Sequence, residues 1–208
     1  MNEMILCMYS GGLDSAGMLH LLLTRDEYKD FAVHVHHMHL VNPENRAAAE
    51  QAATMSAMEY LRQSGARAFG YSESVHRYPA FDLHFIWDAD LCAFMAGNIC
   101  NASPSIRYVA LGRTRTDTET AGHEFERRMA RAQAIFQAAK AMNPHPSEYI
   151  FPVAHLTKQE LWEAIPPELR DRTWSCRRPV YEDGGKSAHA CGRCVSCVTG
   201  HVKQYQKW

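Results

Sequence analysis

The apolar positions of the chain form short runs that predict β-strands. Met4 to Tyr9 is a continuous apolar run that stops at a Ser-Gly-Gly break, so it is too short for a helix and typical of a buried strand. Phe31 to Met38 alternates valine and alanine with histidine, which predicts a second strand. Three shorter apolar runs predict the remaining strands: Ala66 to Tyr71, Tyr108 to Leu111 and Tyr149 to Val153.

The segments between these runs are rich in residues with high helix propensity. The predicted helices are Ser15 to Thr24, Pro43 to Gln63, Asp88 to Cys100 and His123 to Met142. Strands that alternate with helices at this spacing predict an α/β fold, in which a parallel sheet carries helices on both faces. Because ligands of such sheets bind beyond the carboxyl ends of the strands, we expect the chemistry at the break after the first strand.

The last part of the chain has a different pattern. After Pro166-Pro167 the regular alternation stops, and the remaining residues are rich in cysteine, glycine and arginine. We therefore predict a main domain over residues 1–165 and a small appended module over residues 166–208.

The charge balance argues against a large charged partner. The chain has 208 residues, a formal net charge of -1 and a sequence pI of about 6.9, so no global field attracts nucleic acid or an anionic membrane. No apolar run approaches the roughly 20 residues of a membrane span, and the first residues lack the basic start of a signal peptide. We expect a cytoplasmic protein that takes a small substrate, without a membrane or nucleic-acid partner.

The first predicted strand leads through a six-residue loop straight into a helix. The loop consists of Ser10, Gly11, Gly12, Leu13, Asp14 and Ser15. Its glycines let the backbone approach a ligand, the free amides of the helix start favour phosphate, and Asp14 can hold the magnesium of a triphosphate. An ordinary Gly-Gly turn is the alternative. No Gly-Lys-Ser/Thr follows, so the loop differs from the Walker motif.

Four of the seven cysteines gather near the end of the chain. They are Cys176, Cys191, Cys194 and Cys197. Thiolates at two-residue intervals can turn toward one ion, and four of them suit tetrahedral zinc. Disulfides are disfavoured in the cytoplasm, and the clustering disfavours unrelated surface thiols. His189 is an alternative ligand, but four thiolates already fill the coordination sphere, which predicts a structural role for the metal.

The loop and the cysteines together resemble a known family. The Ser-Gly-Gly-x-Asp-Ser string is similar to the signature of the PP-loop ATP pyrophosphatases, which cleave ATP between the α and β phosphates and transfer AMP to the substrate. Within that superfamily, Trp174-Ser175-Cys176 followed by a Cys-x-x-Cys-x-x-Cys run resembles the 7-cyano-7-deazaguanine synthases of the queuosine pathway. Asn45 to Ala53 and Pro152 to Glu160 resemble further stretches of the same family in the same order.

This resemblance implies an ATP-dependent ligase. The implied reaction adenylates 7-carboxy-7-deazaguanine, adds ammonia to form the amide, and activates the amide again to form 7-cyano-7-deazaguanine. The resemblance also implies ATP, Mg²⁺ and Zn²⁺ as cofactors and a homodimer as the assembly. Residues 1–165 would be the PP-loop nucleotide-binding domain, and residues 166–208 the zinc-binding module.

The implied reaction suggests roles for residues outside the loop. A triphosphate and a carboxylate repel each other, and Lys158 is the candidate cation that brings them together, catalytic beside Asp14. Arg46 is a second candidate cation at the nucleotide, and Asp117 can accept hydrogen bonds from the N–H groups of the base. The candidates for stacking on the base are Phe85, Trp87 and Tyr108. Plainer alternatives are a solvated lysine at a helix start, an arginine on a helix face and aromatic side chains in the core.

Four histidines fall in or beside the second predicted strand: His34, His36, His37 and His39. Alternation along a strand sends the first two to one face and the last two largely to the other, so we do not expect one metal ion to gather them.

The chain departs from the family after the fourth predicted strand, where substrate specificity is expected. Thr118 to His123 replaces the family's Ser-Gly-Tyr-x-Asp-Cys-Arg stretch. A PP-loop paralogue that adenylates a different base, a protein or a tRNA, including an enzyme of the tRNA thiolase or lysidine synthetase kind, is therefore a second hypothesis. A third is a non-enzymatic zinc-ribbon binding module, which the intact phosphate loop disfavours.

Overall fold

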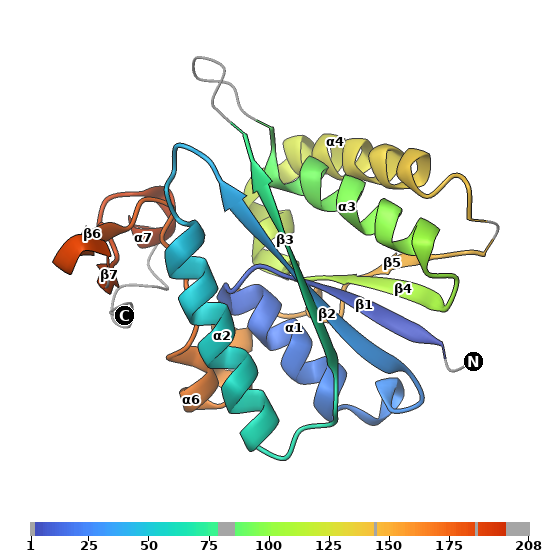
Figure 1. The fold of residues 1–208 in the computed structure, drawn as a ribbon, viewed down its shortest axis with the longest axis horizontal. Helices are drawn as coiled ribbons and strands as arrows, with labels where there is room; N and C mark the ends of the chain where they lie inside the picture. The colour runs from blue at the N-terminus through green and yellow to red at the C-terminus, as the bar shows by residue number, and fades with distance from the viewer. Residues whose placement is uncertain (1–2, 79–85, 144, 186, 199–208) are drawn as a thin grey trace.

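A parallel sheet of five strands forms the centre of the molecule in a computed structural model (Figure 1). The structure describes residues 3–78, 86–143, 145–185 and 187–198. The strands are β1 (Met4–Tyr9), β2 (Ala32–Val41), β3 (Gly70–Arg77), β4 (Ile106–Leu111) and β5 (Glu148–Ile150), in the spatial order β3-β2-β1-β4-β5. The predicted α/β fold with a parallel sheet is confirmed.

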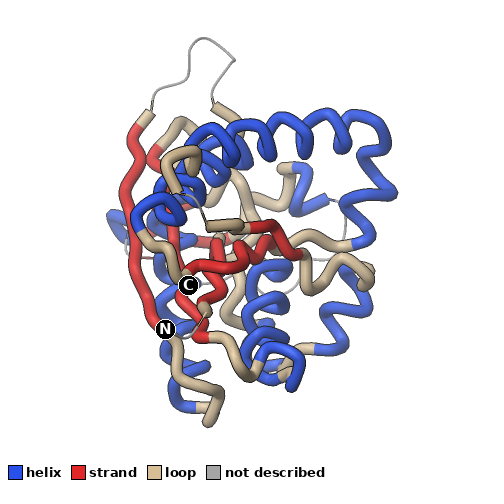
Figure 2. The backbone as a smooth tube through the Cα atoms, turned by 90° about the vertical axis from the view of Figure 1, so that its right-hand side faces the viewer, coloured by secondary structure: helices blue, strands red, loops and turns tan. Residues whose placement is uncertain are grey.

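Helices cover both faces of this sheet, as the two ribbon views show (Figures 1 and 2). One face carries α1 (Leu13–Thr24) and α2 (Ala47–Gln63), and the other carries α3 (Asp88–Ala102) and α4 (Arg115–Ala139). The short elements η1 (Asp26–Tyr28), α5 (Lys158–Ala164) and α6 (Pro167–Arg170) follow α1, β5 and α5 in the chain. Each face has its own hydrophobic core. Among the described residues, no helix combines the length and apolarity of a membrane span.

The order of the strands reverses next to β1. Connections from β1 run to β2 and β3 on one side, whereas β4 and β5 lie on the other side of β1. In open α/β sheets the point where the strand order reverses is where ligands bind, because the loops on its two sides diverge. We therefore expect ligands at this switch point, where the loops after β1 and β4 begin, and we call this region the crevice.

A small module follows α6 and packs against the first half of α2. It contains β6 (Val180–Glu182), η2 (Asp183–Gly185), β7 (Ser187–His189) and α7 (Val195–Val198), and β6 pairs antiparallel with β7. Trp174, Cys176 and Ala188 share a buried cluster with Ala49 and Ala53 of α2. The division into residues 1–165 and 166–208 stays a prediction.

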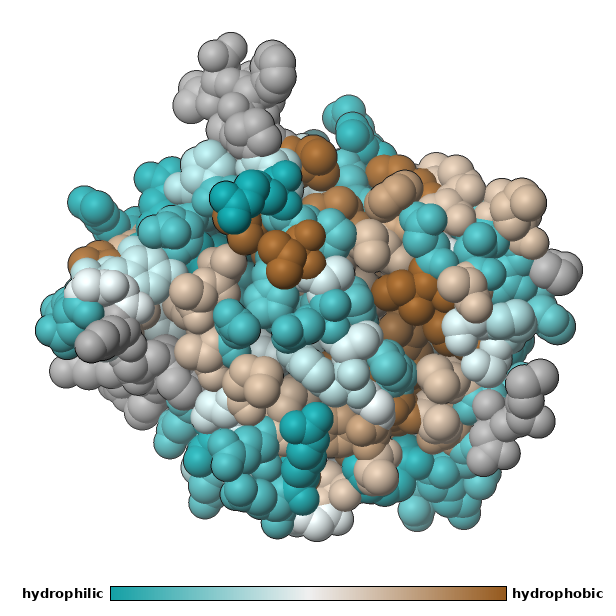
Figure 3. Space-filling view, in the orientation of Figure 1, coloured by the Kyte–Doolittle hydropathy of each residue, from teal (hydrophilic) through white to brown (hydrophobic). Residues whose placement is uncertain are grey.

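The third strand differs from its prediction. The apolar run Ala66 to Tyr71 is mostly irregular, and the strand instead covers Gly70–Arg77, where serine, glutamate and histidine alternate. This is an edge strand whose pairing with β2 decides its position, so its own hydrophobicity carries little signal. Val75 is 67% exposed on it, and the side of the molecule that carries β3 mixes hydrophilic and apolar side chains (Figure 3).

Two helices begin earlier than predicted. The first helix starts at Leu13, not at Ser15, with Gly12 as its N-cap. The fourth starts at Arg115 instead of His123 and breaks at Gly122, whose φ is +49°. Thr114 and Asp117 form a capping box that begins it, a signal present in the sequence.

Arg67 ties the C-terminal end of α1 to the segment that leads into β2. Its guanidinium donates to the carbonyl oxygens of Leu22 at 2.6 Å, Lys29 at 2.9 Å and Tyr28 at 3.0 Å, with longer bonds to Leu23 and Phe31. The last carbonyls of a helix have no partner within the helix, so a cation there satisfies them and complements the helix dipole.

We predict that Arg67→Met lowers the free energy of unfolding by about 2–3 kcal/mol, because several carbonyl oxygens lose a charged donor at once. Arg67→Lys should fall between the wild type and the methionine variant, because a single ammonium cannot reach all of these oxygens. Urea denaturation of the three proteins measures the difference. Equal stability of Arg67→Met and the wild type would contradict this account.

Candidate active site

The predicted phosphate loop lies at the carboxyl end of β1 and turns directly into α1. Gly11 has a φ of +85°, in the left-handed region that favours glycine. Ser15 Oγ donates to the carbonyl oxygen of Gly12 at 2.9 Å and lies 3.1 Å from Ser10 Oγ. Because the first amides of α1 lack partners within the helix, the loop has the geometry of an anion cradle.

Other parts of the chain press closely against this loop. A Cβ on Gly112, directly after β4, would lie 2.8 Å from the backbone of Asp14, so only glycine fits there. On the α2 side, Thr54 Oγ1 lies 2.9 Å from the position of a Cβ on Gly11. The amide of Trp174 donates to the carbonyl oxygen of Gly11 at 2.8 Å. The loop is therefore held in place from several sides.

Lys158 lies between two carboxylates of the crevice. Its Nζ is 3.3 Å from Asp14 and 2.9 Å from Asp117. Burial lowers the pKa of Lys158, but the two carboxylates outweigh it and raise the pKa above its ordinary value. Burial likewise raises the pKa of Asp117, while the Thr114 amide and Lys158 outweigh it and lower the pKa below its ordinary value. The three predicted residues thus meet as charged groups beside the loop.

Hydrogen bonds between α4 and α5 set the position of Lys158. Thr157 is the N-cap of α5, and its hydroxyl accepts from the amide of Glu160 at 3.1 Å. The amide of Lys158 donates to Thr116 Oγ1 at 3.1 Å, and the amide of Arg115 donates to the carbonyl oxygen of Leu156 at 2.8 Å. Lys158 is thus the first residue of α5, as in the plainer alternative of a lysine at a helix start, and it is anchored to the same turn that carries Asp117.

Arg46 occupies a buried cluster of charges next to the loop. It pairs with Glu44 at 2.8 Å and with Glu50 at 2.6 Å, and it also binds Asp88. Arg177 pairs with Glu44 at 2.8 Å and with Asp88 at 3.3 Å. Two guanidinium groups face three carboxylates, which leaves one negative charge in excess. Burial raises the pKa of Glu50 to about 7 although Arg46 opposes it.

A small cavity of about 100 Å³ connects this cluster with the loop. Ser10, Arg46, Glu50 and Asp88 contribute its polar lining together with His36, and the rest comes from Met8, Tyr9, Met38, Leu40 and Cys92. Arg46 therefore borders a cavity beside the phosphate loop, while its own guanidinium is committed to carboxylates in this structure.

The four cysteines of the C-terminal module converge. Their Sγ atoms all lie within 4.8 Å of one another, with Cys194 3.4 Å from Cys197 and 4.0 Å from Cys176. A tetrahedral ion with Zn–S bonds of about 2.3 Å needs sulfurs roughly 3.8 Å apart. A [4Fe-4S] cluster needs wider spacing, because each of its four thiolates binds a different iron. Among the described residues, this is the one group of three or more such side chains placed to share an ion.

The histidines of β2 divide between the two faces as predicted. His36 Nδ1 lies 2.9 Å from Ser72 Oγ and His36 Nε2 lies 2.9 Å from Ser74 Oγ, on the α3 face. On the α2 face, the rings of His37 and His39 are in edge contact at 4.6 Å. Burial lowers the pKa of both His36 and His37 to about 4, so both rings are neutral at pH 7.

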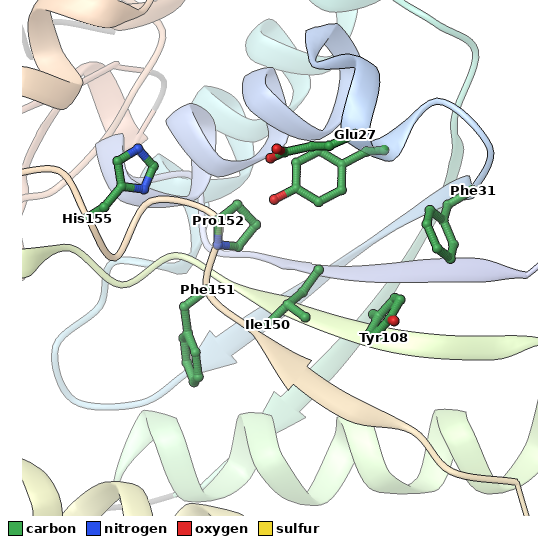
Figure 4. A pocket seen from close by; sticks show the side chains of 8 residues that line it. Glu27, Phe31, Tyr108, Ile150, Phe151, Pro152 and His155 are labelled. Carbon is green, nitrogen blue, oxygen red and sulfur yellow. The ribbon is translucent and has the colours of Figure 1, made fainter.

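The aromatic candidates for stacking lie apart from one another. Trp87 is the N-cap of α3, half-exposed, with the Arg128 guanidinium 3.8 Å from its ring centroid. Tyr108 lines a separate cavity of about 540 Å³ between η1 and the β4–β5 edge, together with Phe31, Ile150 and Pro152 (Figure 4). No residue of the phosphate loop is among the described side chains that line this second cavity. Phe85 lies outside the described residues.

Comparison with known proteins supports the fold and leaves the substrate open. No model of a known protein family matches the chain, and no curated protein matches it. Among solved structures, it resembles the U34-tRNA thiolase NcsA from Methanococcus maripaludis, described with its [4Fe-4S] cluster, with a TM-score of 0.54 at 14% sequence identity. The match covers 78% of this chain and 55% of the thiolase chain. This likeness supports a PP-loop-type fold.

Sequence reasoning missed the partners of Arg46. Glu50 stands four residues after Arg46 in a helical segment, so the pair was visible as an i,i+4 contact. Asp88 and Arg177 are separated by 89 residues, and no local pattern links them. Trp174 was noted only as part of a motif, because its contact with Gly11 depends on how the module packs.

We predict that Glu50→Gln removes a pH dependence of stability. The pKa of Glu50 is raised from 4.5 to about 7, so its contribution is fully present below pH 4.5 and is lost as the pH rises through 7. The free energy of unfolding of the wild type should therefore fall by about 2–3 kcal/mol more than that of Glu50→Gln between pH 5 and pH 8. Denaturant melts at the two pH values measure this, and parallel pH profiles would refute it.

Proposed function

We propose that this chain is an ATP-dependent ligase that adenylates 7-carboxy-7-deazaguanine and converts it with ammonia, through the amide, to 7-cyano-7-deazaguanine. The proposal combines a PP-loop-type fold, a preformed anion cradle and the resemblance of the sequence motifs to that family.

The observation that carries the adenylation chemistry is the position of Lys158. An ammonium held between Asp14 of the phosphate loop and Asp117 in the first turn of α4 stands at the crevice where two anionic substrates would meet. A preorganised cation at such a point stabilises the charge that develops on the transferred phosphate. It requires no reorganisation of water during the reaction.

In the first step the loop amides and the hydroxyls of Ser10 and Ser15 bind the phosphates, and Asp14 holds the magnesium that neutralises them. The substrate carboxylate attacks the α-phosphorus, and pyrophosphate leaves with the electrons of the broken P–O bond. Lys158 turns from Asp117 toward the phosphates when ATP binds, before this step. That movement frees Asp117 Oδ1 to accept an N–H of the base, which is the substrate role we assign to it.

In the second step ammonia attacks the acyl carbon, AMP leaves, and one proton is released. The amide oxygen then attacks the α-phosphorus of a second ATP and again expels pyrophosphate. Departure of AMP with that oxygen, and loss of both protons from the nitrogen, gives the nitrile. Arg46 borders the cavity beside Ser10, and we assign it to the nucleotide side of the site.

The metal of the C-terminal module is zinc in this proposal, held by Cys176, Cys191, Cys194 and Cys197. Burial raises the pKa of Cys176 to about 12, whereas the backbone amides of Arg193 and Cys194 outweigh burial and lower the pKa of Cys191 to about 6, so metal binding would release protons from part of the group. With four thiolates the ion supplies structural stability and no catalytic position. The proposal also includes a cytoplasmic location, where thiols stay reduced, and a homodimer.

A second candidate is a PP-loop paralogue that adenylates a different base, a protein or a tRNA. The observation in its favour is the segment from Thr118 to Gly122, which continues the first part of α4 and departs from the family stretch expected to set specificity. The likeness to a tRNA thiolase fits this candidate equally well.

We predict that the purified protein, incubated with MgATP, ammonium and 7-carboxy-7-deazaguanine, forms AMP and converts the base to its amide or nitrile. Mass spectrometry of the base, with AMP measured in parallel, is the test. AMP formation with an unchanged base would overturn the proposed substrate and favour the paralogue. Unchanged ATP with this base and also with tRNA would count against adenylation by this chain.

We predict that Lys158→Met lowers kcat by about 10²–10³-fold, because the crevice loses its cation at the developing charge. Asp14→Ala should abolish ATP consumption, because the magnesium ligand of the loop is lost. Lys29→Met is the matched control. This exposed lysine precedes β2, at the end of the strands opposite to the phosphate loop, and its loss should leave kcat unchanged. Steady-state AMP formation measures all three, and a Lys158→Met variant as fast as the control would refute the assigned role.

A further inference from the structure

Four residues after α6 run from the phosphate loop to the first metal ligand and its neighbour. We call Trp174–Arg177 the strap. The strap and the loop are far apart in the sequence, because the loop starts at Ser10 and the strap starts at Trp174. Trp174 is 1% exposed, so the strap is anchored in the core at its first residue.

The strap touches the loop through its backbone and through one hydroxyl. The amide of Trp174 donates to the carbonyl oxygen of Gly11 at 2.8 Å. The carbonyl oxygen of Trp174 lies 3.4 Å, and Ser175 Oγ 3.9 Å, from the position that a Cβ on Gly12 would occupy. Gly12 is the N-cap of α1, so the Ser175 hydroxyl stands beside the helix amides that form the anion cradle.

The other end of the strap belongs to the metal module. Cys176 is one of the four converging cysteines, and its carbonyl oxygen accepts from the indole Nε1 of Trp174 at 2.8 Å. Arg177 then pairs with Glu44 and Asp88, the same carboxylates that bind Arg46. Only Ser175 separates the residue that contacts the phosphate loop from a metal ligand.

We propose that the strap is part of the nucleotide site, with the Ser175 hydroxyl contacting the bound phosphates and the metal at Cys176 holding the strap against the loop. This rests on the proposed use of ATP. The strap has little regular secondary structure of its own, and a segment of this kind is ordered by the groups at its two ends. Loss of the metal releases one end, which weakens the bond to Gly11 and removes Ser175 from the cradle. MgATP binding therefore depends on a metal that takes no part in the chemistry.

The first test compares metal-loaded protein with protein stripped by a chelator, without any turnover. Hydrogen–deuterium exchange of the peptide over residues 9–19 should rise after metal removal, while that of β4, residues 106–111, should stay the same. Circular dichroism checks that the sheet remains folded. Unchanged exchange at residues 9–19 would overturn the coupling between metal and loop, whatever the protein does with ATP.

The second test measures binding of Mg²⁺ and α,β-methylene-ATP, which cannot be cleaved between these phosphates, by titration calorimetry. Metal removal should raise its Kd at least tenfold. In metal-loaded protein, Ser175→Ala should raise Kd about tenfold, because one hydrogen bond to a charged group is lost. Ser196→Ala is the matched control, since Ser196 lies in the same module on α7, and its Kd should equal that of the wild type.

Trp174→Phe distinguishes an effect of the strap on nucleotide binding from a general effect of metal loss, because it perturbs the strap and leaves the metal in place. It keeps an aromatic ring in the core and removes the Nε1 bond to Cys176, so it should raise both the exchange of residues 9–19 and the Kd while zinc content stays at one ion per chain. If chelation unfolds the chain, this variant and Ser175→Ala decide the question. A Kd equal to that of Ser196→Ala in both variants would overturn the proposal. No binding in the wild type would instead refute the use of ATP, and the exchange measurement would still test the coupling.

Discussion

The structure depends on how closely the backbone around the phosphate loop is packed. A strand that passes straight into a helix leaves the first amides of that helix without partners, and these amides are the binding groups of the site. To point them into the crevice, the surrounding segments must approach the loop backbone directly. Gly11 and Gly112 make this possible, because at both positions a Cβ would meet atoms at 2.9 Å or less. The geometry of the cradle is therefore a consequence of packing, and it exists before any ligand binds.

Charge is the second element of the site, and it is arranged in two groups with different physical roles. Lys158, Asp14 and Asp117 are partly exposed at the crevice, and the lysine stays charged because carboxylates compensate its burial. The group around Arg46 is buried, and its excess negative charge is relieved by the raised pKa of Glu50. The first group can exchange partners when an anion arrives. The second is enclosed by its own partners and mainly joins α2, α3 and the strap.

The C-terminal module packs against the main part of the fold and contacts the phosphate loop. Its buried residues share a cluster with α2, and its strap reaches the carbonyl of Gly11. Four sulfurs within 4.8 Å of one another suit a single tetrahedral ion, and such an ion would hold the strap in place at a distance from the phosphate loop.

The sequence by itself determined the class of fold, the phosphate loop and the four-cysteine group, because each depends on residues that are close together in the chain. The buried run of β1, the glycines after it and the two-residue cysteine spacing are local signals of this kind. Only the tertiary structure decided the position of β3, the partners of Arg46 and the contact of Trp174 with Gly11. An edge strand takes its position from its neighbour, and charge pairs such as Asp88 with Arg177 join segments 89 residues apart. Interactions of that range exist only once the sheet and its helices have packed, so no pattern along the chain reveals them.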